Sequence, residues 1–224
     1  MFYYYGRKFR LAKLYPEPLK ESNVIVEPFA GSAAYSLHGE RWKKDVILYD
    51  TYDVVVKIWE YLINDATERD IEQLPILKKG DDLRKISYLS DVERFIIGFA
   101  INPGSTSPRN IVSNFSRWTP NKEYIKKNLY KVKHWSIFQK SYSKITENIL
   151  ATWFIDPPYQ KHGIHYPKGG IDFSQLAVWC KERKGLGIVC EGNDGDWLPF
   201  SELTSMKGFQ KRISKEKIWV GKNE

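Results

Sequence analysis

Short apolar runs that end in turn-forming residues alternate with helical stretches along most of the chain. Buried parallel strands are expected at residues 24–26, 46–49, 135–139, 151–155 and 186–191. Helices are expected at residues 33–39 and 53–64, and from Asp172, which can cap a helix, to about Lys184 with Gly185 as the stop. Residues 209–213 and 217–220 predict a terminal hairpin. This order predicts an open, doubly wound α/β sheet that is mostly parallel.

Residues 65–133 interrupt this rhythm and are predicted to form a mainly helical insertion. Residues 92–97 and 124–132 favour helices, and glycine, proline and serine cluster in a loop at 102–108. The remaining segments, residues 1–64 and 134–224, are then predicted to form one domain. In open α/β sheets ligands bind at the carboxyl ends of the strands, so functional residues are expected there.

The positive charge of the chain is concentrated in one segment. The chain has a formal net charge of +8, and residues 102–144 carry nine Lys or Arg and one Glu, which leaves the remainder formally neutral. A neutral body with one basic segment favours a polyanionic partner such as DNA. The alternative is a solvated basic face without a partner.

Composition excludes several other classes. The 224 residues, 42% of them hydrophobic, are enough for a globular core, and no apolar run approaches the length of a membrane helix. No signal-peptide pattern opens the chain, so a cytoplasmic location is expected, in a bacterium or in the host of a phage. Cys180 and Cys190 form no CxxC pair and are interpreted as buried small hydrophobes rather than zinc ligands or disulfide partners.

A turn of small residues follows the first predicted strand, and an acid ends the second. The turn is Glu27-Pro28-Phe29-Ala30-Gly31-Ser32-Ala33, and Asp50 lies 19 residues after Gly31. Small residues let a backbone approach a ligand, and an acid at this spacing commonly binds ribose hydroxyls. An ordinary tight connection and a strand-end cap are the alternatives. A nicotinamide dehydrogenase is disfavoured because G-x-G-x-x-G is absent.

The strongest local motif is Asp156-Pro157-Pro158-Tyr159, which follows the strand predicted at residues 151–155. Two prolines at a strand end fix an extended turn, leave carbonyl groups free and aim the flanking side chains. An acceptor carboxylate, a free carbonyl and an aromatic face together suit a flat base that bears an amino group.

In combination these motifs resemble the Dam-like DNA adenine-N6 methyltransferases, particularly the short phage-type members. Tyr4-Tyr5-Gly6-Arg7-Lys8 resembles the N-terminal motif of that family, and the glycine turn resembles its glycine motif with Ala33 in place of the second glycine. The resemblance implies a class I methyltransferase-like fold, S-adenosylmethionine as cofactor with S-adenosylhomocysteine as product, and no metal. It also implies that the basic insertion recognises DNA.

The resemblance assigns roles to individual residues. It implies catalytic roles for Asp156, Pro157, Pro158 and Tyr159. The implied cofactor-binding residues are Tyr5, Gly6, Lys8, Glu27, Pro28, Phe29, Ala30, Gly31, Ser32, Asp50 and Asp156. Arg109, Arg117, Trp118, Lys126 and Lys127 are candidates for DNA contacts. The chain departs from the family after the third strand, where Lys140-Ser141-Tyr142 replaces the usual acid and aromatic residue.

The implied reaction leaves several alternatives open. A duplex adenine must be flipped out, and Tyr159 is then expected to stack on it while Asp156 and the Pro157 carbonyl accept hydrogen bonds from its amino group. An N4-cytosine or RNA-adenine methyltransferase would use the same amino chemistry, and a non-enzymatic DNA-binding module is a third possibility. His162 and His165 are expected in a loop over the base. The sequence indicates no obligate protein partner and does not reveal whether a restriction endonuclease accompanies the enzyme.

Overall fold

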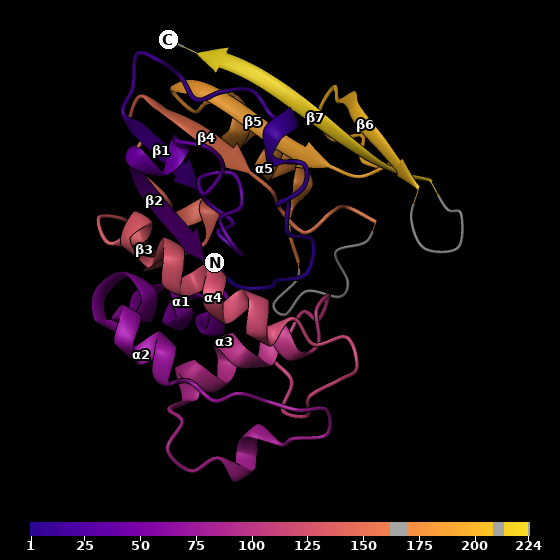
Figure 1. The fold of residues 1–224 in the computed structure, drawn as a ribbon. Coiled ribbons are helices and arrows are strands. Elements are labelled where there is room, and N and C mark those ends of the chain that lie inside the picture. The colour runs from indigo at the N-terminus through magenta and orange to yellow at the C-terminus, as the bar shows by residue number, and fades with distance from the viewer. Residues whose placement is uncertain (162–169, 208–212, 224) are drawn as a thin grey trace.

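The computed structural model describes residues 1–161, 170–207 and 213–223, which form an open seven-stranded sheet flanked by helices (Figure 1). The strand order is β3-β2-β1-β4-β5-β7-β6, and β7 alone is antiparallel to both of its neighbours. The strands are β1 (Val24–Glu27), β2 (Asp45–Asp50), β3 (Ser136–Gln139), β4 (Ala151–Ile155), β5 (Gly185–Glu191), β6 (Ser201–Lys207) and β7 (Ile213–Asn223). The predicted open, mostly parallel α/β sheet is confirmed.

Helices cover both faces of the sheet, as expected for a doubly wound fold. The α-helices are α1 (Asp53–Glu60), α2 (Glu68–Gln73), α3 (Asp91–Ile101), α4 (Trp118–Asn128) and α5 (Phe173–Lys181). Successive side chains of a strand point to opposite faces, and in β4 Phe154 belongs to the core formed with α1, α3 and α4, whereas Trp153 belongs to the core formed with α5. The short helical turns are η1 (Ala12–Leu14), η2 (Arg41–Lys43), η4 (Leu83–Lys85), η5 (Leu129–Val132) and η6 (Tyr142–Lys144), and a π-helical turn, η3 (Tyr61–Asp65), extends α1.

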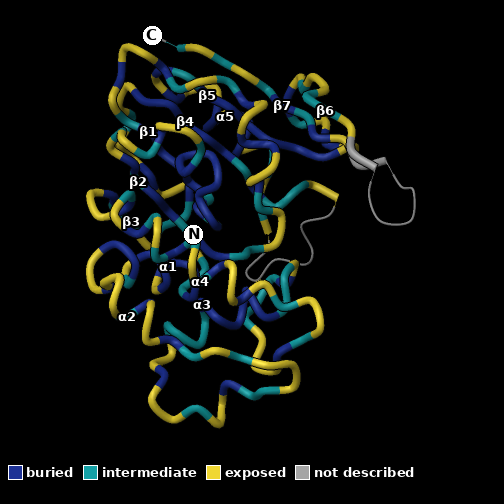
Figure 2. Tube along the Cα trace, viewed as in Figure 1, coloured by how far each residue is buried: buried dark blue, intermediate teal, exposed yellow. Residues whose placement is uncertain are grey.

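The segment between β2 and β3 carries α2, α3 and α4, which lie below one end of the sheet in Figure 1. Two capping boxes define helix starts here, with Thr67 capping α2 and Ser90 capping α3. Buried residues of α3 and α4 belong to the same hydrophobic core as the sheet residue Leu48. Figure 2 shows the buried backbone continuing from the sheet into α3. No helix among the described residues is long and apolar enough to cross a membrane.

The prediction of a helix at residues 33–39 is wrong, because this segment forms a series of turns. Ala33 has a positive φ of 46°, outside the right-handed helical region. In addition, the Ser36 N–H donates to the carboxylate of Glu27 at 3.0 Å, so it is not available for the helical bond four residues back. The buried carboxylate therefore replaces regular helix with a turn.

Three other boundaries differ from the predictions. The helix expected at 124–132 begins earlier, at Trp118, and continues as the 3-10 turn η5. Helix α5 is capped by the Asp172 side chain as expected, but it ends at Lys181. The terminal hairpin exists, but its first strand is β6. The strand predicted at 209–213 lies mostly outside the described residues, and Ile213 begins β7.

Gly185 joins α5 to β5 at a position that admits no side chain. Its φ is +101°, and a Cβ there would lie 2.2 Å from the carbonyl oxygen of Ala151. Gly39 also has a positive φ, of +57°, but a Cβ there would meet nothing within 4 Å. We expect Gly39→Ala to lower the free energy of unfolding by ~1–2 kcal/mol, the cost of a left-handed residue, and Gly185→Ala to lower it by more than ~3 kcal/mol through the added clash. Urea denaturation measures both values, and equal losses would show that the clash is absent.

Candidate active site

A pocket opens at the carboxyl ends of β1, β2 and β4. Its wall includes the turn after β1, where Gly31 has a φ of +43°. A Cβ at Gly31 would lie 3.2 Å from the ring of Tyr4, so the N-terminal segment packs closely over the turn. The indole N–H of Trp59 in α1 donates a hydrogen bond to the Gly31 carbonyl at 2.9 Å, which ties the turn to α1. Glycine is thus favoured both by the backbone angle and by the close approach of Tyr4.

Asp50, the last residue of β2, lies at the edge of the same pocket. Its two carboxylate oxygens accept hydrogen bonds from the backbone N–H groups of Gly31, at 3.1 Å, and Tyr52, at 2.9 Å. Burial raises the pKa of Asp50 above its ordinary value, although these bonds oppose the shift. Each carboxylate oxygen has two acceptor sites, so the side chain can also accept bonds from a ligand hydroxyl.

Glu27 is a fully buried carboxyl group at the end of β1. One of its oxygens accepts hydrogen bonds from both the N–H and the hydroxyl of Ser36, at 3.0 and 2.5 Å. Burial raises the pKa of Glu27 to about 8, against the opposing effect of these bonds. Glu27 is therefore mostly protonated at neutral pH and adds little charge to the pocket.

Asp156, the residue directly after β4, lies between the pocket and a lysine. The Lys8 ammonium group is 3.2 Å from Asp156 Oδ1. Burial raises the pKa of Asp156 to about 6, the Lys8 charge opposes that shift, and the nearby Glu216 carboxylate adds to it. Asp156 is consequently ionised at neutral pH and becomes protonated in mildly acidic solution.

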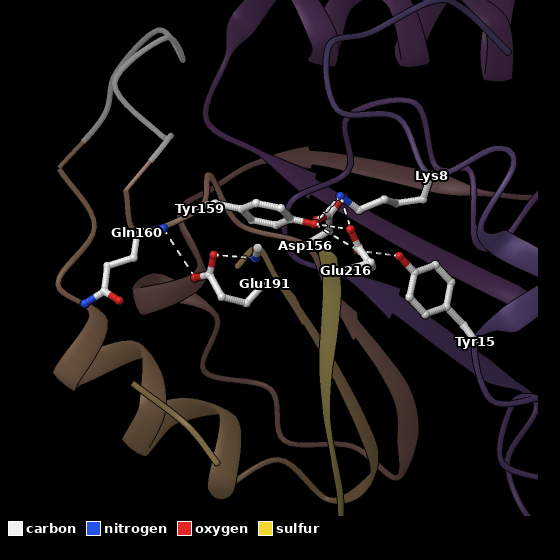
Figure 3. Close-up of polar contacts among 8 residues, drawn as sticks. Lys8, Tyr15, Asp156, Tyr159, Gln160, Glu191 and Glu216 are labelled. Atoms are coloured by element: carbon white, nitrogen blue, oxygen red, sulfur yellow. Dashed lines mark hydrogen bonds and ion pairs between the residues drawn. The ribbon is translucent and has the colours of Figure 1, made fainter. Parts of the chain in front are cut away.

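Tyr159 points its hydroxyl group away from the solvent and toward Glu216 of β7 (Figure 3). The hydroxyl lies 2.9 Å from each oxygen of the Glu216 carboxylate and also contacts the Lys8 ammonium group. Tyr15 donates to Glu216 at 2.7 Å from the opposite side. The predicted catalytic turn at residues 156–159, the N-terminal segment and β7 therefore meet at one cluster of polar groups.

A second buried carboxylate, Glu191 at the end of β5, holds the residue that follows Tyr159. Its oxygens accept bonds from the Trp197 indole at 2.7 Å, the Gly192 N–H at 2.7 Å and the Gln160 N–H at 3.3 Å. Figure 3 shows Glu191 on the opposite side of the Tyr159 ring from Lys8. The donors to this carboxylate are two backbone N–H groups and an indole, which favours a structural role for Glu191.

The pocket brings together the residues that the sequence motifs predicted to bind the cofactor, including the N-terminal Tyr5, Gly6 and Lys8 as well as Asp50 and Asp156. Of the other residues of the predicted catalytic motif, Pro158 also lines the pocket, Pro157 is buried and is not part of the lining, and Tyr159 reaches the polar cluster. The departure after the third strand places Ser141 and Tyr142 in the pocket wall. Their roles stay predictions.

The residues predicted to contact DNA have different environments. Trp118 is 2% exposed and its indole donates to the Pro75 carbonyl at 2.8 Å, so the expectation that it faces DNA is wrong. Trp118 was a candidate for DNA contact because it stands beside Arg117 in the sequence. Arg109, Arg117 and Lys127 are exposed. Lys126 pairs with Glu72 at 3.3 Å and with Glu123 at 3.6 Å, which neutralises part of its charge.

Cys180 and Cys190 are both free and buried, which confirms their interpretation as small hydrophobic residues. Burial raises the pKa of both thiols, so neither is an activated nucleophile. His162 and His165 lie outside the described residues. Among the residues that the structure does describe, no group of three or more His, Cys, Asp or Glu is arranged to hold a metal ion.

The strand order and the position of the pocket define a class I methyltransferase-like fold. Residues 4–95 match the family of D12 class N6 adenine-specific DNA methyltransferases, which confirms the resemblance indicated by the motifs and supports a methyltransferase. A search of curated proteins found no match. Among solved structures, the yhhF protein from Escherichia coli is similar at a TM-score of 0.35 and 10% identity, over 87% of this chain and 74% of that chain, a likeness that supports no statement about function.

The raised pKa of Glu27 has a consequence for stability. The folded protein keeps a proton on Glu27 up to about pH 8, whereas the unfolded chain releases it near the ordinary value of 4.5. The contribution of this group to stability is therefore lost as the pH rises from about 4.5 to 8, by up to a few kcal/mol. Glu27→Gln keeps an acceptor for Ser36 but cannot ionise, so its stability relative to wild type should increase over this range.

Urea denaturation at pH 5, 6.5 and 8 measures this difference, with the exposed Glu40→Gln as the control. A difference between Glu27→Gln and wild type that is the same at all three pH values would contradict the raised pKa.

Proposed function

We propose that the protein transfers a methyl group from S-adenosylmethionine to the exocyclic N6 of a flipped-out adenine in DNA. The observation that carries this proposal is the position of Asp156. Its carboxylate lies at the end of β4 in a pocket that also contains the glycine turn and Asp50. The match of residues 4–95 to an adenine-specific DNA methyltransferase family supports the same reaction.

The pocket suits a cationic, nucleoside-containing cofactor. S-adenosylmethionine, when bound, supplies an electrophilic methyl group on a positively charged sulfur. Glu27, Asp50 and Asp156 line the pocket, and because Glu27 is mostly protonated, the two aspartates are the groups that favour a cation. We propose that Asp50 accepts bonds from the ribose hydroxyls and that Phe29 and Tyr142, which pack on each other in the pocket wall, contact the adenine of the cofactor.

The residues of the catalytic turn would hold the target base. In this proposal Asp156 and the carbonyl of Pro157 accept hydrogen bonds from the amino group, which directs the nitrogen lone pair out of conjugation with the ring. These acceptors require an ionised Asp156, so methyl transfer should decline as the pH falls below about 6. The proposed chemistry relies on positioning and electrostatics, because the methyl group passes directly from the cofactor to the target nitrogen.

Two other substrates share this amino chemistry, N4 of cytosine and N6 of adenine in RNA. Adenine in DNA is favoured by the family match. A non-enzymatic DNA-binding module is disfavoured because Asp156 and Tyr159 are present and Asp156 lines the pocket. Transfer of a tritiated methyl group to unmethylated DNA and to RNA, followed by mass spectrometry of the nucleosides, separates these possibilities. N6-methyladenine from DNA is the expected product, and its absence would overturn the proposal.

The role of Asp156 can be separated from that of Asp50 by comparing their alanine variants. Asp156→Ala should lower the methyl-transfer rate by at least ~10²-fold, as for loss of an oriented polar group at other active sites. It should keep the fold and a cofactor affinity within a few-fold, because Glu216 still lies 3.5 Å from Lys8. Asp50→Ala should instead weaken cofactor binding by ~1–3 kcal/mol.

Single-turnover kinetics and calorimetric titration with S-adenosylmethionine measure the two effects. Near-normal turnover by Asp156→Ala would refute its role at the target base, and loss of cofactor binding would move Asp156 into the cofactor site.

The exposed basic residues of the insertion are proposed to contact DNA phosphates. Neutralising Arg109, Arg117 and Lys127 with glutamine should reduce the slope of log affinity against log salt by about 0.9 for each residue that contacts a phosphate. Lys181→Gln is the matched control, because Lys181 is exposed on α5, which packs on the other face of the sheet. Fluorescence anisotropy with labelled DNA at several salt concentrations measures the slope. An unchanged slope in the triple variant would mean that these charges only face solvent.

A further inference from the structure

We propose that Glu216 of β7 is a positioning residue for methyl transfer, which orients the Tyr159 ring by accepting a hydrogen bond from its hydroxyl group. This inference rests on the proposed function, in which the ring of Tyr159 stacks on the target base. Sequence motifs give no indication of this role, since Glu216 lies outside every motif considered above.

The geometry of the contact fixes one end of the ring. The Tyr159 hydroxyl is 2.9 Å from both oxygens of Glu216, and Tyr15 donates to the same carboxylate at 2.7 Å. Glu216 is only 5% exposed. Figure 3 shows the hydroxyl end of Tyr159 directed at Glu216 between Asp156 and Tyr15. The hydroxyl anchor fixes the direction of the ring axis, and Gly192, where a Cβ would lie only 2.9 Å from the ring, limits rotation about that axis. Stacking on a base requires both.

The electrostatics of the cluster favour the same direction of hydrogen bonding. Burial and the nearby carboxylates raise the pKa of the Tyr159 hydroxyl well above its ordinary value, so the hydroxyl stays protonated and acts as a donor. The Lys8 ammonium group lies 3.5 Å from Glu216 and 3.2 Å from Asp156 and is shared by the two carboxylates. A carboxylate this deeply buried needs such partners, and every partner of Glu216 described here belongs to the N-terminal segment or the catalytic turn.

The strand register explains how β7 delivers this side chain. Residues 216 and 218 point to the same face of β7, because side chains alternate along a strand. Ile218 belongs to the core that also contains Tyr15, so Glu216 points toward the N-terminal segment. The neighbouring Lys217 pairs with Glu191 of β5 in the ladder, which fixes the position of β7 along the sheet. Through Glu216, the C-terminal strand β7 thus anchors Tyr159, which lies 57 positions earlier in the chain.

The inference is tested with Glu216→Gln, Glu216→Ala, Tyr159→Phe and the double variant Glu216→Ala/Tyr159→Phe, with Glu202→Gln as the matched control. Glu202 lies on the same hairpin, half-exposed, and pairs with Lys215 at 2.7 Å. Circular dichroism and thermal unfolding establish which variants fold, and Glu216→Gln provides a variant of nearly the same shape if the alanine variant does not. Calorimetry with S-adenosylmethionine then checks that the cofactor site is intact.

If Glu216 acts through the Tyr159 hydroxyl, Glu216→Ala and Tyr159→Phe should each lower kcat by ~10- to 10²-fold. The double variant should be no slower than the worse single variant. Glu216→Gln, whose amide oxygen still accepts from the hydroxyl, should recover most of the rate, and Glu202→Gln should resemble wild type. Cofactor affinity should stay within a few-fold throughout.

Two results would overturn the positioning role. One is a double variant in which the losses of the two single variants multiply, and the other is a Glu216→Gln variant that folds normally but is as slow as Glu216→Ala. If the variants that contain Glu216→Ala do not fold, Glu216→Gln and Tyr159→Phe decide the question. The positioning role then requires that Glu216→Gln keeps most of the wild-type rate while Tyr159→Phe lowers it. A wild-type protein that forms no N6-methyladenine would overturn the proposed function itself, and this inference with it.

Discussion

The charge balance around Lys8 holds the candidate active site together. A buried ammonium group is unfavourable unless carboxylates compensate it, and here Asp156 and Glu216 approach it from two strands, β4 and β7. Because these strands are separated by β5 in the sheet, the lysine bridges across the carboxyl end of an intervening strand. The N-terminal segment is therefore fixed over the pocket, where Tyr4 packs against Gly31.

The strands of the sheet could be predicted because each is short, apolar and closed by a turn signal. The helix expected at 33–39 could not be excluded from the sequence, since the competing acceptor for Ser36 is the Glu27 carboxylate of the preceding strand. Strand β6 was missed because the sequence of residues 201–207 is largely polar, as is common for a strand at the edge of a sheet. Local patterns therefore identified the interior of the sheet better than its edge.

The pocket residues were predictable because they lie in contiguous motifs at strand ends. Glu216 was not, because its partners Tyr159 and Tyr15 lie 57 and 201 residues away. A possible signal was a charged residue at an inward position of an alternating strand, two residues before the buried Ile218. Trp118 shows the opposite error, since a basic neighbour in sequence suggested DNA contact for a side chain that packs inside the insertion.

The shared core has a consequence for the modularity of the protein. Residues of α3 and α4 are buried in the same cluster as the strand residues beneath them, so no separate interior closes off the segment between β2 and β3. Phe99 of α3 packs against Phe2 and Tyr4, at ring-centroid separations of 5.6 and 5.5 Å. Replacing this segment with that of a relative would disrupt the packing of these rings. Chimeras that exchange the insertion would have to carry the N-terminal residues along with it, so that both halves of this aromatic junction come from one parent.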